Sequence, residues 1–229
     1  MSNLDIPILN SLEKILQESL RMEDSIRWKK YVKRREAREE NSLQHSYKAS
    51  LLATIVIENE KKYSKEDFDS YLVLKATVLH DIGEIEEKDT VYIDKTDEGD
   101  RREHSFFQRF TSALPKHIKE KMDIAYDLQN SRKPGFSKVS DRIRNVYPLE
   151  VNLFDAIERL GYVLFAYREF REGSPKIFVQ TLRNQHSHLV RLAEELPGFE
   201  RSFYPKFTQD KVEQFLKKYK GQWIEQKGE

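Results

Sequence analysis

Residues 76–84 of the chain read Ala-Thr-Val-Leu-His-Asp-Ile-Gly-Glu, and this stretch decides the fold. The apolar spacing leading into it predicts a core helix that opens near Ser64-Lys-Glu-Asp67, a segment resembling a helix-capping box. Successive residues of a helix point about 100° apart. His80 and Asp81 can therefore contact one shared ion only where the helix ends or bends. Gly83 follows directly and permits the helix to end there.

A second histidine lies in residues 39–50, Glu-Glu-Asn-Ser-Leu-Gln-His-Ser-Tyr-Lys-Ala-Ser. Asn41 and Ser42 are candidate N-caps of a helix running to about residue 60, with His45 on its apolar face. A lone histidine on such a face is ordinarily a hydrogen-bonded core residue. Burying imidazole together with carboxylate is costly unless something compensates them, and a divalent metal accepts this mixed ligand set. The joint pattern therefore predicts a metal site.

Helical periodicity continues through the rest of the chain, without a convincing strand pair or an internal repeat. Residues 86–100 are charged and weakly periodic, which indicates a long loop. The other predicted helices cover roughly residues 8–16, 101–113, 116–129, 149–171, 176–195 and the segment from about 208 onward. No low-complexity linker divides the chain. We therefore expect an all-α, single-domain helical bundle over residues 1–196, with residues 197–229 as a helical extension packed on the same domain.

The composition excludes several classes of site. The 40 basic and 39 acidic residues leave a net charge of +1, so the chain gives no strong signal for nucleic acid or an anionic membrane. The basic stretch 29–38 favours a phosphate-attracting rim or a solvated face over an RNA site. The absence of cysteine excludes disulfides and thiolate chemistry. With no signal peptide and no apolar run of ~18 residues, we expect a cytoplasmic protein without a membrane partner.

The two histidine segments together resemble the HD superfamily of metal-dependent phosphohydrolases, and in particular its bacterial 5′-deoxynucleotidase branch. That branch has an Arg-Trp pair, a Glu-Asn pair before the first histidine, a His-Asp-x-x-Glu motif and a downstream aspartate. The matching residues of this chain are Arg27-Trp28, Glu40-Asn41, His45, His80-Asp81-x-x-Glu84 and Asp89. The resemblance covers roughly residues 5–195 and implies a helical bundle of the HD-domain type.

The resemblance implies that His45, His80 and Asp81 hold one divalent transition metal. Mn, Co, Fe, Ni and Zn all suit such ligands, and the resemblance favours Mn or Co. The family takes its fourth ligand, an aspartate, from a later core helix, and the best match for that helix has Glu158 in the corresponding place. The rival is Asp141 in the segment Lys-Val-Ser-Asp-Arg-Ile-Arg-Asn-Val, which resembles a motif of the (p)ppGpp hydrolases. We favour Glu158.

Two acidic residues are the candidate catalytic groups. Glu84 lies one turn after His80, where its carboxylate could take a proton from the attacking water, although a solvated glutamate at a helix end is the simpler interpretation. Asp89 would be its partner, protonating the leaving oxygen or binding substrate. Asp94 and Asp97 lie in the same acidic loop and compete for this role.

Two residues are the candidate substrate-binding groups. Arg27 would bind the phosphate through its bidentate guanidinium. Trp28 would pack against the sugar or base, unless it serves as a structural anchor. For the remaining histidines, a surface or supporting role is a better interpretation than ligation; these are His104, His117, His186 and His188.

The implied substrate is a small-molecule nucleotide, and the implied reaction is release of phosphate from a (deoxy)nucleoside 5′-monophosphate. A (deoxy)nucleoside triphosphate or (p)ppGpp is the alternative substrate. The replacement of the family aspartate by Glu158 also leaves open a catalytically inactive helical binding or regulatory module. Relatives commonly dimerise, and the apolar side of the predicted C-terminal helix is compatible with a homodimer.

Overall fold

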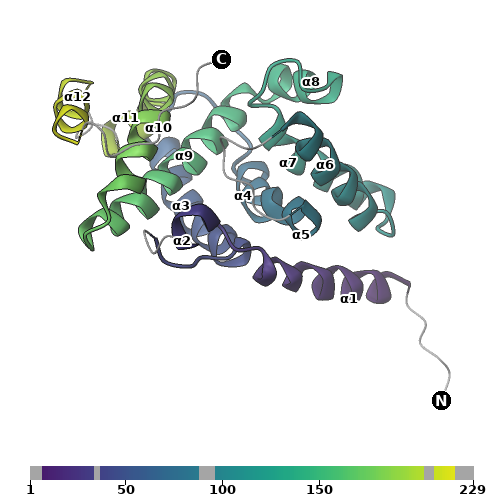
Figure 1. The fold of residues 1–229 in the computed structure, drawn as a ribbon. Coiled ribbons are helices and arrows are strands. Elements are labelled where there is room, and N and C mark those ends of the chain that lie inside the picture. Colours follow the sequence, from purple (N-terminus) through teal and green to yellow (C-terminus); the bar gives the residue numbers. More distant parts are fainter. Residues whose placement is uncertain (1–6, 34–36, 88–95, 204–208, 220–229) are drawn as a thin grey trace.

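The computed structural model of the chain describes residues 7–33, 37–87, 96–203 and 209–219, and these residues form helices and connecting turns (Figure 1). In chain order the elements are α1 (Pro7–Ser19), η1 (Leu20–Asp24), α2 (Lys29–Lys33), α3 (Ser42–Tyr63), α4 (Ser70–Leu79), η2 (His80–Gly83), α5 (Glu84–Glu87), α6 (Asp97–Phe110), α7 (Lys116–Asn130), α8 (Lys138–Val146), α9 (Pro148–Arg171), α10 (Pro175–Glu195), α11 (Pro197–Phe203) and α12 (Gln209–Lys218). The described part of the chain contains no strand, which confirms the all-α prediction.

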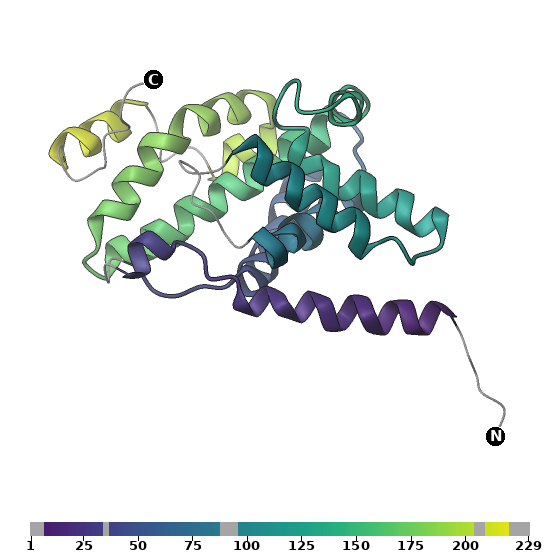
Figure 2. The same ribbon diagram turned by 45° about the vertical axis from the view of Figure 1, so that its right-hand side comes forward.

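Helix α9 lies in the middle of the molecule, between α10 on one side and α6 and α7 on the other (Figures 1 and 2). One buried apolar cluster joins α9 to α3, α10 and α11, and it includes Ala53, Ile157 and Leu182. A second cluster joins the start of α9 to α6 and α7, and it includes Phe107 and Phe154. Helix α4 contributes to both clusters. Side chains on α4 and α9 are therefore held between two packed layers.

The start of α3 follows the sequence prediction. Asn41 is the N-cap, its side chain accepts the Gln44 N–H (2.8 Å), and the Gln44 side chain accepts the Asn41 N–H (3.3 Å) in return. The capping box fixes where α3 begins, and His45 follows one turn into the helix.

The start of α4 differs from the sequence prediction, which placed a capping box at residues 64–67. Ser64 instead ends α3, and the N-cap of α4 is Asp69, whose side chain accepts the Leu72 N–H (2.9 Å). The backbone N–H of Asp69 donates to the buried Glu150 carboxylate of α9 (2.7 Å). A contact between distant segments therefore selects the helix start, and local spacing could not reveal it.

Three further elements differ from the sequence predictions. Helix α6 begins earlier than expected, because the Thr96 side chain caps it by accepting the Gly99 N–H (3.1 Å), so residues 97–100, expected as part of a loop, are helical. Residues 138–146 form helix α8, capped by Ser137. Residues 197–203 form helix α11. Each of these starts depends on a single cap or on a short segment, for which apolar periodicity gives little signal.

Helix α11 packs directly on the end of α3. The Phe199 N–H donates to the Glu60 carboxylate (3.0 Å), and the Asn59 side chain donates to the Gly198 carbonyl. A Cβ atom at Gly198 would lie 2.6 Å from the Cα of Glu60, so only glycine permits this approach. Residues 197–203 therefore rest on the same body as α3, while a domain boundary at residue 196 stays a prediction.

The two ends of the described chain lie at the periphery. Helix α1 extends away from the bundle in both ribbon views, and Leu12, Leu16 and Leu20 are exposed along α1 and into η1. Helix α12 packs through Phe215 against Phe178 of α10. None of the described helices combines the length and the apolar character needed to cross a lipid bilayer.

Candidate metal centre

Four buried side chains from α3, η2 and α9 converge on one point. His45 comes from the first turns of α3, His80 and Asp81 begin η2, and Glu158 lies midway along α9. At Leu79 the α-helix gives way to a 3₁₀-helix, which is the bend expected from the sequence. The ligand atoms of His45, His80 and Asp81 all lie within 4.8 Å of one another.

Gly83 serves a different purpose from the one expected. The chain continues from η2 into α5 directly after it, so Gly83 does not end the helical segment. A Cβ atom at this position would lie 2.5 Å from the Tyr126 hydroxyl oxygen and 2.6 Å from the Glu103 Cβ. The glycine is therefore required for close packing of η2 against α6 and α7, and this packing fixes the position of the His-Asp pair.

Glu158 lies next to both histidines. Its Oε1 is 3.3 Å from His80 Nε2 and 3.7 Å from His45 Nε2. Asp81 completes the group, with Oδ1 3.1 Å from His80 Nε2 and Oδ2 3.8 Å from His45 Nε2. The exposed fractions of the four residues are 6%, 3%, 6% and 1% in chain order, so water does not reach most of their polar atoms.

Three of the converging atoms are buried without a hydrogen-bond partner among the described residues: His45 Nε2, His80 Nε2 and Glu158 Oε1. Leaving a buried polar atom unsatisfied costs about 1–3 kcal/mol, so three together need a compensating group. Two imidazole nitrogens with two carboxylates form a donor set that suits a divalent transition metal. The residues present therefore fit a metal ion.

Neighbouring residues orient these groups. The carbonyl of Thr77 lies 3.0 Å from His80 Nδ1, an arrangement that leaves Nε2 directed into the centre. The Tyr162 hydroxyl donates to Glu158 Oε2 (3.1 Å), so Oε1 is the atom that faces the histidines. The Gln129 side chain donates to the His80 carbonyl (2.8 Å) and ties η2 to α7.

The centre is electrostatically suited to a cation. Burial alone would lower the pKa of His80, but the charges of Asp81 and Glu158 outweigh it and raise that pKa to about 9. Burial alone would raise the pKa values of Asp81 and Glu158, but the adjacent His80 holds both well below their usual range. Without a metal, a proton on His80 thus compensates part of the carboxylate charge, and a bound cation would replace that proton.

Glu84 and Arg27 form a second layer beside Asp81. Arg27 Nη1 donates to Asp81 Oδ2 (2.7 Å) and lies 3.4 Å from Glu84 Oε2. The Ser42 hydroxyl donates to the same Glu84 oxygen (2.5 Å). Glu84 is 4% exposed, so its carboxylate belongs to the buried centre and is not a solvated helix-end group. The sequence identified Ser42 only as a possible cap, because nothing in its spacing links it to Glu84.

A short antiparallel pairing brings Arg27 to the start of α3. The Arg27 N–H donates to the Glu40 carbonyl (2.8 Å), and the Ser42 N–H donates to the Ser25 carbonyl (2.9 Å). The Glu40 carboxylate is buried and accepts a hydrogen bond from Lys48 (2.5 Å). The Arg27-Trp28 and Glu40-Asn41 pairs of the sequence therefore lie on the two paired segments, next to each other in space.

Trp28 is half-buried and packs against α9. Its ring stacks on Phe165 of α9, with centroids 5.0 Å apart, and meets Tyr162 edge-on at 6.1 Å. Trp28 has a φ angle of 57°, in the left-handed region that side chains other than glycine rarely adopt. Such strain is common at functional sites. Trp28 is thus an anchor beside the centre, and its contact with a sugar or base stays a prediction.

The other candidate residues lie elsewhere. Asp141 accepts the Gly135 N–H (3.0 Å) in the first turn of α8, and it is not among the described side chains that converge on the histidines. Asp89 and Asp94 lie outside the described residues, as does the side chain of Asp97. The remaining histidines do not join the centre: His104 pairs with Asp127 (3.0 Å) on α7, His117 lies on α7, and His186 and His188 lie on α10.

Comparisons with known proteins agree with this architecture. The family model of the HD domain matches residues 25–157, which is more than half of the chain. The match includes His45, His80 and Asp81 and ends one residue before Glu158. A crystal structure described as a predicted metal-dependent phosphohydrolase from Magnetospirillum magnetotacticum MS-1 superposes with a TM-score of 0.54, at 17% sequence identity over 93% of each chain. A search of curated proteins finds no significant match. On the family match, this chain belongs to the HD-domain family.

Proposed function

We propose that this protein is a metal-dependent phosphohydrolase that releases phosphate from nucleoside 5′-monophosphates, including deoxynucleotides. The observation that carries the proposal is the convergence, beside Asp81, of three buried ligand atoms that have no hydrogen-bond partner among the residues the structure describes. Membership of the HD-domain family supports hydrolysis of a phosphate ester. The nucleotide specificity rests on the resemblance of the Arg27-Trp28 and Glu84 segments to the 5′-deoxynucleotidases.

His45, His80, Asp81 and Glu158 would hold one divalent transition metal, with Mn or Co favoured by the resemblance. When bound, such an ion lowers the pKa of a coordinated water and offsets charge on the phosphate. The four side chains approach from three different elements and already converge on one point, so these are the residues that would hold the ion. The four side chains are buried, so bulk water has little access to them.

Glu84 would accept the proton of the attacking water. Its carboxylate is already oriented by Ser42 and lies beside Asp81 through their shared partner Arg27. General-base groups act from such positions when they lie within hydrogen-bond reach of the water. Arg27 would exchange part of its contact with the carboxylates for the phosphate oxygens and stabilise their charge. Asp89 is proposed as the group that protonates the leaving oxygen.

Two alternatives make different predictions. A (deoxy)nucleoside triphosphate or (p)ppGpp hydrolase would use the same centre on another substrate. A helical binding module without catalysis would have lost the metal, and the position of Glu158 beside both histidines argues against that loss.

Phosphate release from a panel of nucleotides, with Mn²⁺ or Co²⁺ added, tests the proposal directly. We expect release from nucleoside 5′-monophosphates and loss of at least about a thousandfold of the rate in His80→Ala. Release only from triphosphates or (p)ppGpp would transfer the activity to the alternative substrates. Unchanged hydrolysis in His80→Ala would show that the reaction takes place at another site.

A further inference from the structure

Three arginines from three elements surround one buried carboxylate on α9. Asp155 is 4% exposed and lies one helical turn before Glu158. Its carboxylate is 3.3 Å from Arg132 Nη1, 3.0 Å from Arg159 Nε and 3.6 Å from Arg191 Nη2. These three arginines belong to the turn after α7, to α9 and to α10, and with Asp155 they are called the arginine cluster below.

The arginine cluster has more positive charge than its carboxylates balance. Arg191 also pairs with Glu195 (2.9 Å). Glu158 lies in the electrostatic range of Arg132 as well, but it faces the two histidines of the metal centre, so the ion pairs within the cluster set three guanidinium groups against two carboxylates. Half-buried His188 lies in the electrostatic range of Asp155, Arg159 and Arg191 as well. One surplus positive charge in a partly buried place attracts an anion more strongly than the same charge in open solvent.

The Nη2 atoms of Arg132 and Arg159 are hydrogen-bond donors that the described contacts of these side chains leave available. Arg132 uses Nε for the Gln129 carbonyl (3.0 Å) and Nη1 for Asp155. Arg159 uses Nε for Asp155 and Nη1 for the Gln185 side chain (2.5 Å). In the part of the chain that the structure describes, Nη2 of each arginine has no hydrogen-bond partner. The two side chains are 22% and 13% exposed, so both are held in place yet reach the surface.

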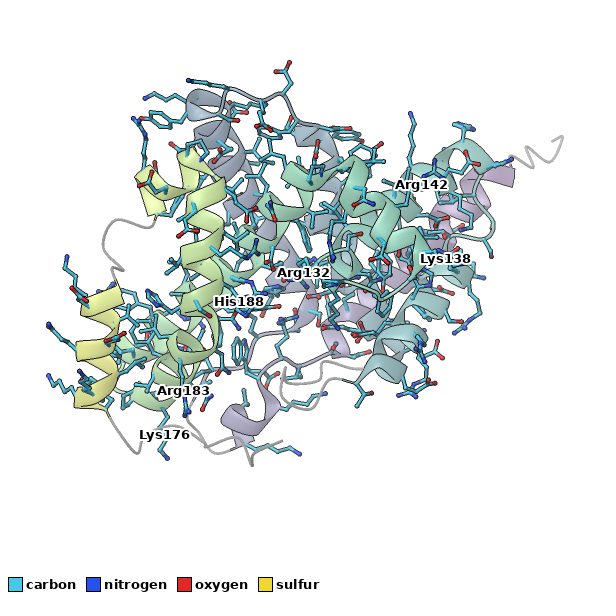
Figure 3. All side chains as sticks on the ribbon, turned by 90° about the horizontal axis from the view of Figure 1, so that it is seen from above. Arg132, Lys138, Arg142, Lys176, Arg183 and His188 are labelled. Carbon is cyan, nitrogen blue, oxygen red and sulfur yellow. The ribbon has the colours of Figure 1, made fainter. Side chains whose placement is uncertain are left out.

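The arginine cluster lies beside the metal centre. The Arg132 guanidinium lies over the Phe154 ring, 5.2 Å from the ring centroid. The His80 ring contacts the same Phe154 ring edge-on, with the two centroids 5.7 Å apart. Burial alone would lower the pKa of Arg132, but Asp155, Tyr162 and Glu158 raise it overall, so Arg132 is within electrostatic range of the centre. Figure 3, the view from above, labels Arg132 and His188 near its middle and Arg142 at its upper right.

We propose that Arg132 and Arg159 form a subsite for a second phosphate group, so that the preferred substrate is a nucleotide carrying one phosphate besides the one released. A nucleoside 3′,5′-bisphosphate is the simplest member of this class. The inference rests on the proposed function, because it places the scissile phosphate at the metal centre. Guanidinium groups suit the role, since each offers paired donors to phosphate oxygens.

A purely structural role makes a different prediction. Arginines that only tie α7, α9 and α10 to Asp155 would contribute to folding stability, without any dependence on a second phosphate. The experiment must therefore compare two substrates on the same protein variant, so that a general loss of stability or activity cancels from the ratio.

The test measures kcat/KM for deoxyadenosine 3′,5′-bisphosphate and for deoxyadenosine 5′-monophosphate, with the metal-loaded full chain. In the wild-type protein we expect the bisphosphate to be preferred by about tenfold or more, as one or two charge-assisted hydrogen bonds would give. The ratio should fall to about one in Arg132→Gln and Arg159→Gln. It should stay at the wild-type value in Arg142→Gln, which removes an exposed arginine of α8.

A second readout separates this inference from the proposed function. Isothermal titration of the metal-free protein with deoxyadenosine 3′,5′-bisphosphate should show binding that Arg132→Gln and Arg159→Gln weaken about tenfold. If no nucleotide is hydrolysed, the proposed function fails and this titration alone decides on the subsite. Equal kcat/KM values for the two substrates in the wild-type protein, or no binding in the titration, would overturn the subsite. If one of the two variants does not fold, the other variant decides by itself.

Discussion

Glu158 differs from an ordinary buried glutamate in how its two oxygens are used. One accepts the Tyr162 hydroxyl, and the other faces two histidine nitrogens that lack partners among the described residues. The sequence identified His45, His80 and Asp81 because helical spacing puts them on core faces. It favoured Glu158 over Asp141 only through the family resemblance, since spacing along the chain does not say which carboxylate reaches across the bundle.

Glu158→Gln tests the fourth ligand. Replacing a carboxylate by a neutral amide removes a charged ligand atom, so we expect metal affinity to fall by at least about 100-fold, the upper range for loss of a group that only supports a ligand, while the fold is kept. Metal content per chain after dialysis, measured by plasma mass spectrometry, checks this. The matched control is Asp141→Asn, which should keep its metal. The reverse pattern, with metal lost only from Asp141→Asn, would assign the fourth ligand to α8.

His104 gives a pH-dependent contribution to stability. Its hydrogen bond to Asp127 raises the pKa of His104, and burial opposes this effect. A histidine whose pKa is raised on folding stabilises the folded state below its unfolded pKa of about 6.5, and this stabilisation is lost as the pH rises through the folded value.

We therefore expect the melting temperature of the wild-type protein to exceed that of His104→Gln most at about pH 6, with the difference shrinking towards pH 9. Because His104 is 34% exposed, the effect should be modest. Thermal unfolding of both proteins across this range measures the difference. A difference that grows with pH would mean that the Asp127 pair does not stabilise the charged histidine.

Among the secondary-structure elements, the long helices could be predicted from the apolar periodicity of the sequence, and the short ones could not. Helices α3, α7, α9 and α10 have sustained apolar faces, and the sequence located them to within a few residues. Helices α8 and α11 are short, and the starts of α4 and α6 depend on single caps at Asp69 and Thr96. The placement of η2 depends on contacts across the bundle, which no local pattern encodes.

Gly83→Ala tests how tightly η2 is packed. The added methyl group would overlap Tyr126 and Glu103, so we expect a loss of about 1–3 kcal/mol in the free energy of unfolding, with weaker metal binding. Urea denaturation measures the first effect. Gly161→Ala is the matched control, since a Cβ atom at this position of α9 meets no atom within 4 Å and should stabilise the helix by about 0.5–1 kcal/mol. Equal effects of the two substitutions would contradict the close packing.

In the whole molecule, α9 contributes residues to both buried apolar clusters, to the metal centre and to the arginine cluster. The HD-domain match ends at residue 157, just before Glu158, and the helices after it complete the bundle around α9. The all-α fold was predictable from the sequence because helical apolar spacing runs along most of the chain. A cytoplasmic location and a homodimer stay predictions.

Phe199→Ala tests whether the segment after residue 196 is part of the same folded body. Phe199 is 1% exposed between α11 and the rest of the first cluster, so its truncation should cost about 3–5 kcal/mol in a single unfolding transition. The half-buried Phe203, also on α11, serves as the comparison, with a smaller expected loss in Phe203→Ala. A loss below about 1 kcal/mol in Phe199→Ala would indicate that α11 adds little to the domain.

The central claim is that one metal ion, held by His45, His80, Asp81 and Glu158, makes this protein a phosphohydrolase. Its most direct test is phosphate release from deoxyadenosine 5′-monophosphate by metal-free protein to which Mn²⁺ is added stepwise, at protein concentrations well above the dissociation constant. We predict that release is absent at the start, rises in proportion to added metal and levels off at about one ion per chain. Release that does not depend on metal, or no release from the fully loaded protein, would contradict the account.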